Sequence, residues 1–319
     1  MNHSPFGFKV IKPGMLSQIQ DAGRFGKNRI GLTTGGPLDP QTFNIANALL
    51  NNSATESTSI EITMGGLVLE SGIDTFISIC GAPMPLKING KTKALWCIHP
   101  VKVGDIIEVA FTSRGLRAYL AVKDGFQVTP QFGSAATVVR ENIGGLNGAA
   151  LGTGDTLSCS SSKECLLHKL PDNQIPTYNR HVLLRTIPCY QHNFFSREQK
   201  QRFFSSYYRV SDKIDRMGYR FEGNKIESSL SGILSEGISL GAIQVPADGQ
   251  PIVLLQDRQT IGGYPKLGTV ISSDLAKLSQ LTPGCTVNFR PVTVETAQRI
   301  NTEENQKHID LEFEQLNSV

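Results

Sequence analysis

The feature that most constrains the fold is a succession of short runs rich in β-branched and aromatic residues, each bounded by glycine, proline or aspartate. The first half of the chain contains five such runs, at Phe8–Ile11, Ser59–Met64, Thr75–Cys80, Ile106–Phe111 and Ala118–Val122. The second half contains four, at Leu183–Ile187, Gly218–Phe221, Ile252–Leu255 and Thr286–Phe289. Because 31 glycines and 16 prolines are spread through the sequence, turns are frequent and the strands are short. We expect a mainly β protein.

A few helices are also predicted. The clearest one follows Asp39, a good N-cap residue, and has Pro40 at its first position and an apolar face. Ser196 begins another, with a glutamine three positions later in the pattern of a capping box. A short apolar stripe starts near Ser273, and the segment from Thr293 onward also has helical periodicity.

The length of 319 residues indicates two domains. The strand pattern lapses between Ser158 and Asn179, where small polar residues and prolines replace the apolar runs. We therefore predict a β-rich N-terminal domain over residues 1–165, a C-terminal domain over residues 180–292 and a helical tail over residues 293–319.

Charge and composition exclude several classes of protein. Thirty-one basic residues against 28 acidic ones give a net charge of +3, and the basic residues are scattered, so we expect neither nucleic acid nor an anionic membrane as a partner. No apolar run has the length of a membrane span or the form of a signal peptide, which predicts a cytoplasmic protein. The six histidines are solitary and the six cysteines form no Cys-x-x-Cys pair, so no metal site is expected.

Polar residues and glycines interrupt the apolar pattern in four segments. The first follows the opening strand and contains Gln20, Asp21 and Arg24. Gly23 allows a sharp turn there, which would project the carboxylate and the guanidinium to the same side. The alternative is a solvated turn with an internal ion pair.

The second segment has adjacent glycines, Gly35 and Gly36, just before the helix that Asp39 caps. Exposed backbone N–H groups and a helix N-terminus together can hold a phosphate or carboxylate. Alternatively, the carboxylate of Asp39 itself occupies that helix end. The third segment, Ser211–Arg220, carries five charges in ten residues, for which surface salt bridging is the default interpretation.

The fourth segment, Gly241–Lys266, is the most informative. In it the apolar strand Ile252–Leu255 ends directly in a group of polar residues. Arg258 has the shape to bind a carboxylate or phosphate with two hydrogen bonds, and Asp257 has the chemistry to take a proton or orient a water. The alternative is a hydrogen-bonded polar plug at the mouth of a barrel. The candidate binding residues around these two are Gln244, Gln259, Thr260, Gly262, Gly263, Tyr264 and Lys266.

Together these segments resemble one family, the biotin-dependent carboxyltransferase-like proteins, also called the allophanate hydrolase subunit 2 family. Its bacterial members include the C component of 5-oxoprolinase, which the chain resembles most. The resemblance rests on Pro13–Arg24, Leu38-Asp39 with Asn44–Asn47, Glu61–Gly66, Arg117–Val122, Gly133-Ser134, Asp215–Gly218 and Ser235–Pro265. These motifs occur in order along nearly the whole chain.

The resemblance implies a pair of cyclophilin-like β-barrel domains and a heteromeric complex. The implied partners are a subunit resembling allophanate hydrolase subunit 1 and a third subunit similar to lactam-utilisation proteins. The complex would use ATP with Mg²⁺ to open the lactam 5-oxo-L-proline, giving L-glutamate. We assign candidate catalytic roles to Asp21, Arg24, Asp257 and Arg258, with Asp257 as an acid, base or magnesium ligand, and candidate binding roles to the seven residues above together with Gln20 and Asp39.

Two other functions stay open. Fused relatives transfer a carboxyl group from carboxybiotin to urea, which needs a biotin carboxylase and a biotinyl domain. No lysine lies between two methionines here, so we expect no biotin attachment site in this chain. Related chains have also been described as antagonists of a histidine-kinase inhibitor, a regulatory role that needs binding to the partner subunit without catalysis.

Overall fold

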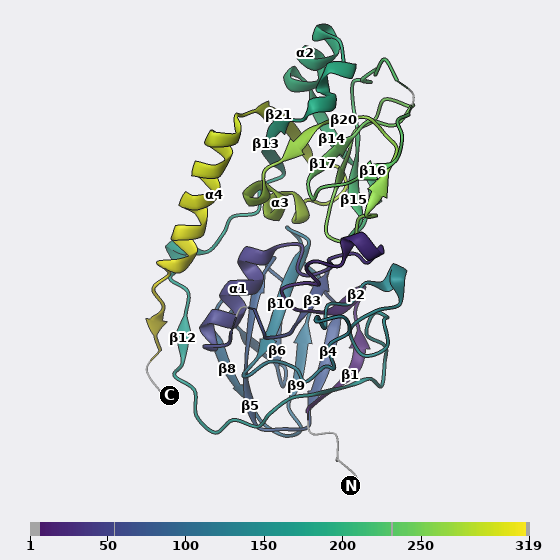
Figure 1. Ribbon diagram of the computed structural model, residues 1–319. Helices are drawn as coiled ribbons and strands as arrows, with labels where there is room; N and C mark the ends of the chain where they lie inside the picture. The colour runs from purple at the N-terminus through teal and green to yellow at the C-terminus, as the bar shows by residue number, and fades with distance from the viewer. Residues whose placement is uncertain (1–6, 54, 231, 317–319) are drawn as a thin grey trace. The chain divides into compact units, whose positions relative to one another are not determined.

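The computed structural model describes residues 7–53, 55–230 and 232–316 (Figure 1). The chain divides into two compact units. The first consists of the residues up to Phe25, Gly35–Tyr178 and the residues from Leu311 onward. The second consists of Gly26–Thr34 and Asn179–Asp310, so a short N-terminal segment belongs to the unit built mainly from the second half of the sequence.

The first unit is built on two antiparallel sheets. The larger has the strand order β11-β1-β4-β9-β6-β7, and the smaller has the order β2-β3-β10-β5-β8. Their strands are β1 (Gly7–Pro13), β2 (Leu16–Gln20), β3 (Ser59–Thr63), β4 (Leu67–Ser71), β5 (Thr75–Gly81), β6 (Leu86–Ile88), β7 (Lys91–Lys93), β8 (Ile98–Val101), β9 (Ile106–Val109), β10 (Arg117–Val122) and β11 (Thr156–Ser158).

Alternation along the strands builds the core of this unit. In β4, for example, Leu67, Leu69 and Ser71 are buried, while Val68 and Glu70, which alternate with them, are partly exposed. The two leucines join Phe8, Ile60 and Leu120 in one apolar cluster. The helix α1 (Pro40–Leu49) packs on β5 and β10 with Phe43 and other apolar side chains in a second cluster.

The second unit contains a closed barrel of seven strands, in the order β13-β20-β17-β18-β15-β14-β21. A separate two-stranded sheet pairs β16 with β19. The strands are β13 (His181–Pro188), β14 (Tyr207–Ile214), β15 (Gly218–Glu222), β16 (Glu236–Gly237), β17 (Ala242–Gln244), β18 (Ile252–Leu254), β19 (Ile261–Gly262), β20 (Lys266–Val270) and β21 (Thr286–Pro291). Aromatic side chains pack together at β21, where Phe203 stacks on Phe289 with ring centroids 4.5 Å apart.

The helices begin where the sequence predicts. Asp39 caps α1 by accepting a hydrogen bond from the backbone N–H of Thr42, and Ser196 caps α2 (Arg197–Ser205). The second unit also contains α3 (Ser272–Ser279) and α4 (Val294–Ile309), which Thr293 caps. The described residues also form short 3₁₀ turns at η1 (Asn28–Ile30), η2 (Val139–Glu141), η3 (Asp172–Gln174) and η4 (Tyr190–Phe194). The prediction of a mainly β chain with a few helices is confirmed.

The predicted helical tail over residues 293–319 is wrong in its last part. Helix α4 stops at Ile309, and the chain then forms the short strand β22 (Glu314–Gln315), which pairs with β12 (His168–Lys169) within the first unit. Leu311 and Phe313 pack against the cluster that holds α1, so burial of these apolar side chains accounts for the change of conformation. Residues 317–319 lie outside the described part of the chain.

In the described part of the chain, no helix combines the length and the apolar character needed to cross a membrane.

Candidate functional site

The predicted site residues divide between the two units. Gln20, Asp21, Arg24 and Asp39 lie in the first unit. Gln244 and the residues from Asp257 to Lys266 lie in the second. We therefore describe two groups of side chains, each within its own unit.

In the first unit, Arg24 and Asp21 both bind the segment from Gln131 to Ala136. The Arg24 guanidinium is fully buried and donates to three backbone carbonyls, at 2.9 Å to Gln131 and 3.1 Å to both Ser134 and Ala136. Asp21 accepts from the Ser134 hydroxyl and the Ala135 backbone N–H, each at 2.6 Å. The interpretation of a solvated turn is wrong for Arg24, because these contacts fix a distant loop.

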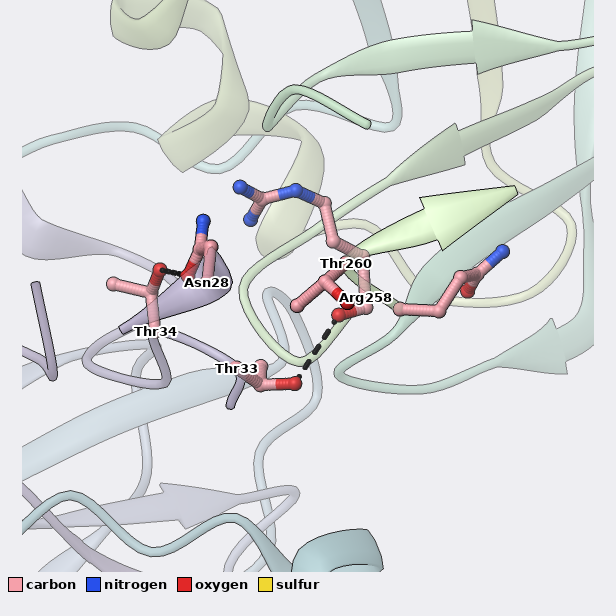
Figure 2. Close-up of a pocket in the computed structure, with 6 residues that line it drawn as sticks. Asn28, Thr33, Thr34, Arg258 and Thr260 are labelled. Atoms are coloured by element: carbon pink, nitrogen blue, oxygen red, sulfur yellow. Dashed lines mark hydrogen bonds between the residues drawn. The ribbon is translucent and has the colours of Figure 1, made fainter. Parts of the chain in front are cut away.

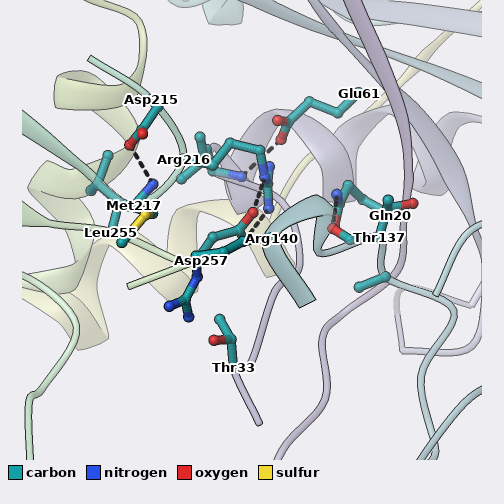
Figure 3. Close-up of polar contacts among 12 residues, drawn as sticks. Gln20, Thr33, Glu61, Thr137, Arg140, Asp215, Arg216, Met217, Leu255 and Asp257 are labelled. Carbon is teal, nitrogen blue, oxygen red and sulfur yellow. Dashed lines mark hydrogen bonds and ion pairs between the residues drawn. The ribbon is translucent and has the colours of Figure 1, made fainter. Parts of the chain in front are cut away.

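Gln20 and Asp39 also have partners within the first unit. Gln20 accepts from the backbone N–H of Gly36 and donates to the carbonyl of Thr137, each at 3.1 Å (Figure 3). The Asp39 carboxylate accepts from the backbone N–H of Thr42 at 3.1 Å and from its hydroxyl at 2.8 Å. The carboxylate of Asp39 thus occupies the helix end that an external anion would need.

Sequence reasoning missed the buried pair Glu61 and Tyr119 beside this helix end. The Tyr119 hydroxyl donates to Glu61 at 2.7 Å, and the backbone N–H of Leu38 donates to the same carboxylate oxygen at 3.0 Å. Burial, followed by the nearby carboxylate, raises the pKa of Tyr119 well above its ordinary value. A glutamate between two isoleucines in a predicted strand was the available signal.

In the second unit, Asp257 is one half of a buried ion pair. Arg216 donates to its carboxylate through Nε at 2.9 Å and Nη2 at 3.0 Å, as Figure 3 shows. Both residues are buried. The prediction that the Ser211–Arg220 cluster lies on the surface is therefore wrong for Arg216, whose partner is 41 positions further along the chain.

Arg258 has carbonyl partners. Its Nε donates to Ile238 at 3.1 Å and its Nη1 donates to Leu255 at 3.3 Å. Burial lowers the pKa of this guanidinium from its ordinary value. Within the described residues, no carboxylate lies within ion-pair distance of Arg258.

Two strands, β16 and β19, hold the glycine-rich loop that follows Arg258. The backbone N–H of Ile238 donates to the carbonyl of Thr260 at 3.1 Å, and that of Ile233 donates to Gly263 at 2.8 Å. Gly262 is the cross-strand partner of Glu236. Ile261 and Tyr264 flank the glycines and are exposed. The structure thus gathers most of the fourth predicted segment around residues 233–238.

Lys266 belongs to a polar network that the sequence did not reveal. Its ammonium donates to the carboxylate of Glu236, which also accepts from the Tyr190 hydroxyl and, at 2.6 Å, from the Gln191 amide. The hydrogen bond from Lys266, followed by that from Tyr190, lowers the pKa of Glu236 below its ordinary value. A positive and a negative charge therefore lie beside the glycine loop.

Gln244 is the cross-strand neighbour of Lys266, and its amide nitrogen Nε2 is buried without a hydrogen-bond acceptor among the described residues. A side chain at Gly262 would fill the space beside it. A Cβ atom there would lie 2.4 Å from Ile238 Cδ1 and 3.0 Å from Gln244 Nε2. A residue larger than glycine at this position would therefore have to displace the end of the Ile238 side chain.

A small pocket lies next to this loop in the second unit. Figure 2 shows its lining, which consists of Asn28, Thr33, Thr34, Arg258, Gln259 and Thr260. The Thr33 hydroxyl donates to the backbone carbonyl of Arg258 at 3.3 Å, which ties the 26–34 segment to this loop. A buried cation, amides and hydroxyls beside glycine backbone form a surface that can stabilise negative charge on a ligand.

Comparison with known proteins places this chain among carboxyltransferase domains. Residues 30–291 match the family model described as carboxyltransferase domain, subdomain A and B. The chain is 33% identical to the C component of 5-oxoprolinase from Escherichia coli, with 97% of each chain covered. It is 32% identical to the corresponding 5-oxoprolinase component of Haemophilus influenzae, covering 92% of this chain and 93% of that one.

Larger proteins contain a similar region. Urea amidolyase of Saccharomyces cerevisiae is 29% identical over 93% of this chain, but this chain covers only 17% of that protein. The solved structure of the Kluyveromyces lactis urea carboxylase matches the whole chain with a TM-score of 0.91 and 28% identity, over 30% of its own length.

Proposed function

Because this chain belongs to the carboxyltransferase domain family, subdomains A and B, we propose that it is a subunit of an ATP-dependent 5-oxoprolinase complex. In this reaction, water adds to the ring carbonyl of 5-oxo-L-proline and the amide C–N bond breaks, giving L-glutamate. The proposal names this chain as a component that binds the lactam, while other subunits complete the assembly.

One observation carries the proposal, namely the similarity to two bacterial 5-oxoprolinase components along almost their whole length. This chain and the Escherichia coli protein correspond over 97% of both sequences. By contrast, the urea amidolyase region is a sixth of a much larger protein. This chain is also more similar to the Escherichia coli protein, at 33% identity, than to urea amidolyase, at 29%.

Ring opening needs stabilisation of negative charge on the carbonyl oxygen, because an amide resists attack while its resonance is intact. Preorganised donors in a water-poor site supply such stabilisation most effectively. Arg258 is the buried cation suited to this work, and the Gly262-Gly263 backbone lies in the same loop. The Nε2 of Gln244 is a further donor with no acceptor among the described residues.

The other candidates take supporting roles in this proposal. Asp257, paired with Arg216, fixes the start of the loop that carries Arg258. Lys266 and Glu236 supply a proton donor and acceptor beside the glycines. Arg24 and Asp21 hold the 131–136 segment in the first unit, so we assign them positioning roles.

The residues of this chain are better suited to bind the phosphate groups of ATP than to coordinate its magnesium ion. The pocket at Arg258 offers a cation, amides and hydroxyls but no carboxylate, which suits phosphate oxygens. Among the described residues, no three histidine, cysteine or acidic side chains cluster as a metal site. When bound to the complex, ATP supplies the free energy for opening an unstrained amide. We propose that this chain contributes phosphate-binding donors and that magnesium ligands come from the partners, a subunit resembling allophanate hydrolase subunit 1 and one similar to lactam-utilisation proteins.

The substrate is tested by ATP hydrolysis in the assembled complex. The proposal predicts that 5-oxoproline stimulates release of phosphate and that glutamate forms in proportion. Within that complex, Arg258→Gln is expected to lower glutamate formation by about a hundredfold, the usual effect of losing one donor to a developing oxyanion. Arg209→Gln removes an exposed charge of the same unit and serves as the matched control.

Carboxyl transfer to urea is the second candidate, favoured by the structural likeness to the Kluyveromyces lactis urea carboxylase. It predicts that urea, and not 5-oxoproline, stimulates ATP hydrolysis, and only when a biotin carboxylase and a biotinylated carrier are added. If urea stimulates ATP hydrolysis in the presence of these two added components and 5-oxoproline does not, the second proposal replaces the first.

A further inference from the structure

The pocket at Arg258 contains hydrogen-bond donors that have no acceptor among the described residues. Arg258 uses Nε and Nη1 for the carbonyls of Ile238 and Leu255, while Nη2 donates to no described residue. The Thr260 hydroxyl also has no partner among the described residues. Two donors of one pocket, one of them cationic, therefore lack acceptors.

Asn28 adds a third donor, because Thr34 fixes its orientation. The Thr34 hydroxyl donates to Asn28 Oδ1 at 3.3 Å, as Figure 2 shows, so the carbonyl side of the amide is occupied and Nδ2 is left as a donor. Asn28 is exposed, whereas Thr33 and Arg258 are buried. The pocket thus has an open rim at Asn28 and a cationic floor at Arg258.

The charges around the pocket favour an anion. None of its six lining residues carries a carboxylate. The nearest acidic residue in sequence, Asp257, is engaged with Arg216 through two hydrogen bonds. A buried guanidinium without a carboxylate partner is costly, and an anionic ligand would remove that cost.

We propose that Asn28, Arg258 and Thr260 form an oxyanion-binding site in the second unit. The ligand is a group with several acceptor oxygens and a negative charge, either inorganic phosphate or the carboxylate of a small organic acid. Thr33 and Thr34 shape the site, Thr33 by binding the Arg258 carbonyl and Thr34 by orienting Asn28. The inference deepens the proposed function, since it rests on the phosphate-binding role proposed there for this pocket, and it concerns binding by this chain without any other subunit.

The experiment uses the full chain alone and observes the probes by NMR, at constant ionic strength maintained with sodium chloride. Phosphorus-31 line widths report inorganic phosphate, and carbon-13 line widths report the carboxylate of 5-oxoproline. The lactam 2-pyrrolidinone, which has the ring amide but no carboxylate, separates recognition of the carboxylate from recognition of the ring.

The variants remove one donor at a time. Arg258→Gln is expected to weaken phosphate or carboxylate binding at least about tenfold, and Thr260→Val, which keeps the side-chain shape, by about threefold to tenfold. Arg209→Gln removes an equal charge at an exposed position and is expected to leave binding unchanged. Because Arg258 also binds two carbonyls, Thr260→Val decides the matter if Arg258→Gln does not fold.

Phosphate binding that weakens in both pocket variants supports the site with phosphate as its ligand. Binding of 5-oxoproline without binding of 2-pyrrolidinone, weakened by the same variants, supports it with a carboxylate. The proposal is overturned if neither probe binds more tightly than chloride, or if Thr260→Val and a folded Arg258→Gln bind as the wild type does. Failure here leaves the ring-opening assay of the complex unaffected, so the two proposals fail separately.

Discussion

The carboxylate of Asp257 is held by the Arg216 guanidinium through two hydrogen bonds of 2.9 Å and 3.0 Å, with both side chains buried in the second unit. Arg216 precedes β15, and Asp257 follows β18. The pair therefore joins the start of β15 to the end of β18, which are neighbouring strands of the barrel. Arg258 follows Asp257 directly in the sequence. Its geometry makes Asp257 a positioning residue for the loop that carries the candidate site.

Breaking this pair is expected to destabilise the protein strongly. Arg216→Met removes two charge-assisted hydrogen bonds from the buried Asp257 carboxylate, which costs about 3–5 kcal/mol. The exposed pair of Arg209 and Glu222 is the matched control, and Arg209→Gln is expected to cost less than about 1 kcal/mol. The free energy of unfolding in urea measures both. Equal losses in the two variants would show that the buried pair does not hold the loop.

Gly262→Ala is expected to reduce activity of the complex, because the new methyl group would lie 2.4 Å from Ile238 Cδ1. Ile238 is buried, so relieving this overlap moves the end of its side chain or the loop, at the lower end of the range of about 1–3 kcal/mol for overpacking. Gly237→Ala, in the paired strand, is the control, since a Cβ there meets no atom within 4 Å. Rates of glutamate formation compare the two variants, and equal rates would contradict a tightly packed loop.

Asp274 makes stability depend on pH. Burial by itself would raise the pKa of this carboxyl, but hydrogen bonds from Arg185, at 2.6 Å and 2.8 Å, outweigh burial and hold the pKa below its ordinary value. A lowered pKa in the folded state stabilises the protein above the unfolded pKa of about 3.9, and this stabilisation is lost as the pH falls through the folded value.

The test of this linkage compares wild type with Asp274→Asn by urea unfolding at about pH 6 and about pH 3. The difference in unfolding free energy is expected to be large at the higher pH and smaller at the lower one. Glu303→Gln, which affects an exposed pair with Arg299, should give a small difference at both. If the difference in unfolding free energy between wild type and Asp274→Asn is as large at the lower pH as at the higher one, the lowered pKa of Asp274 is refuted.

Asp39 is expected to act on stability through the helix that it caps. Asp39→Ala removes two hydrogen bonds to Thr42 and should lower the free energy of unfolding by about 1–2 kcal/mol. Thr293→Ala, at the exposed cap of α4, should cost less. Unchanged stability together with lost activity in Asp39→Ala would instead favour the alternative of a ligand at this helix end.

Local patterns made much of the fold predictable. Strand β10, the cap at Asp39 and the cap at Ser196 depend on residues within a few positions of one another, and all three are found in the structure. Strand β22 was missed, because two polar residues form it only through pairing with β12, far away in the sequence.

The site was less predictable, because its partners are distant in sequence. Arg258, Gly262 and Lys266 stood out as a polar group after an apolar strand. Arg216 looked like a member of a surface cluster, since only the folded barrel brings it to Asp257. Thr33 lies 225 positions from the carbonyl that it binds, and no local pattern indicates that contact.

The most direct test of the account is omission of this chain from the reconstituted complex. Glutamate formed from 5-oxoproline and ATP is measured with all three subunits, and again with each one left out. We expect glutamate from the complete mixture and none above background when this chain is missing. Equal glutamate with and without this chain would contradict its proposed role in opening the ring.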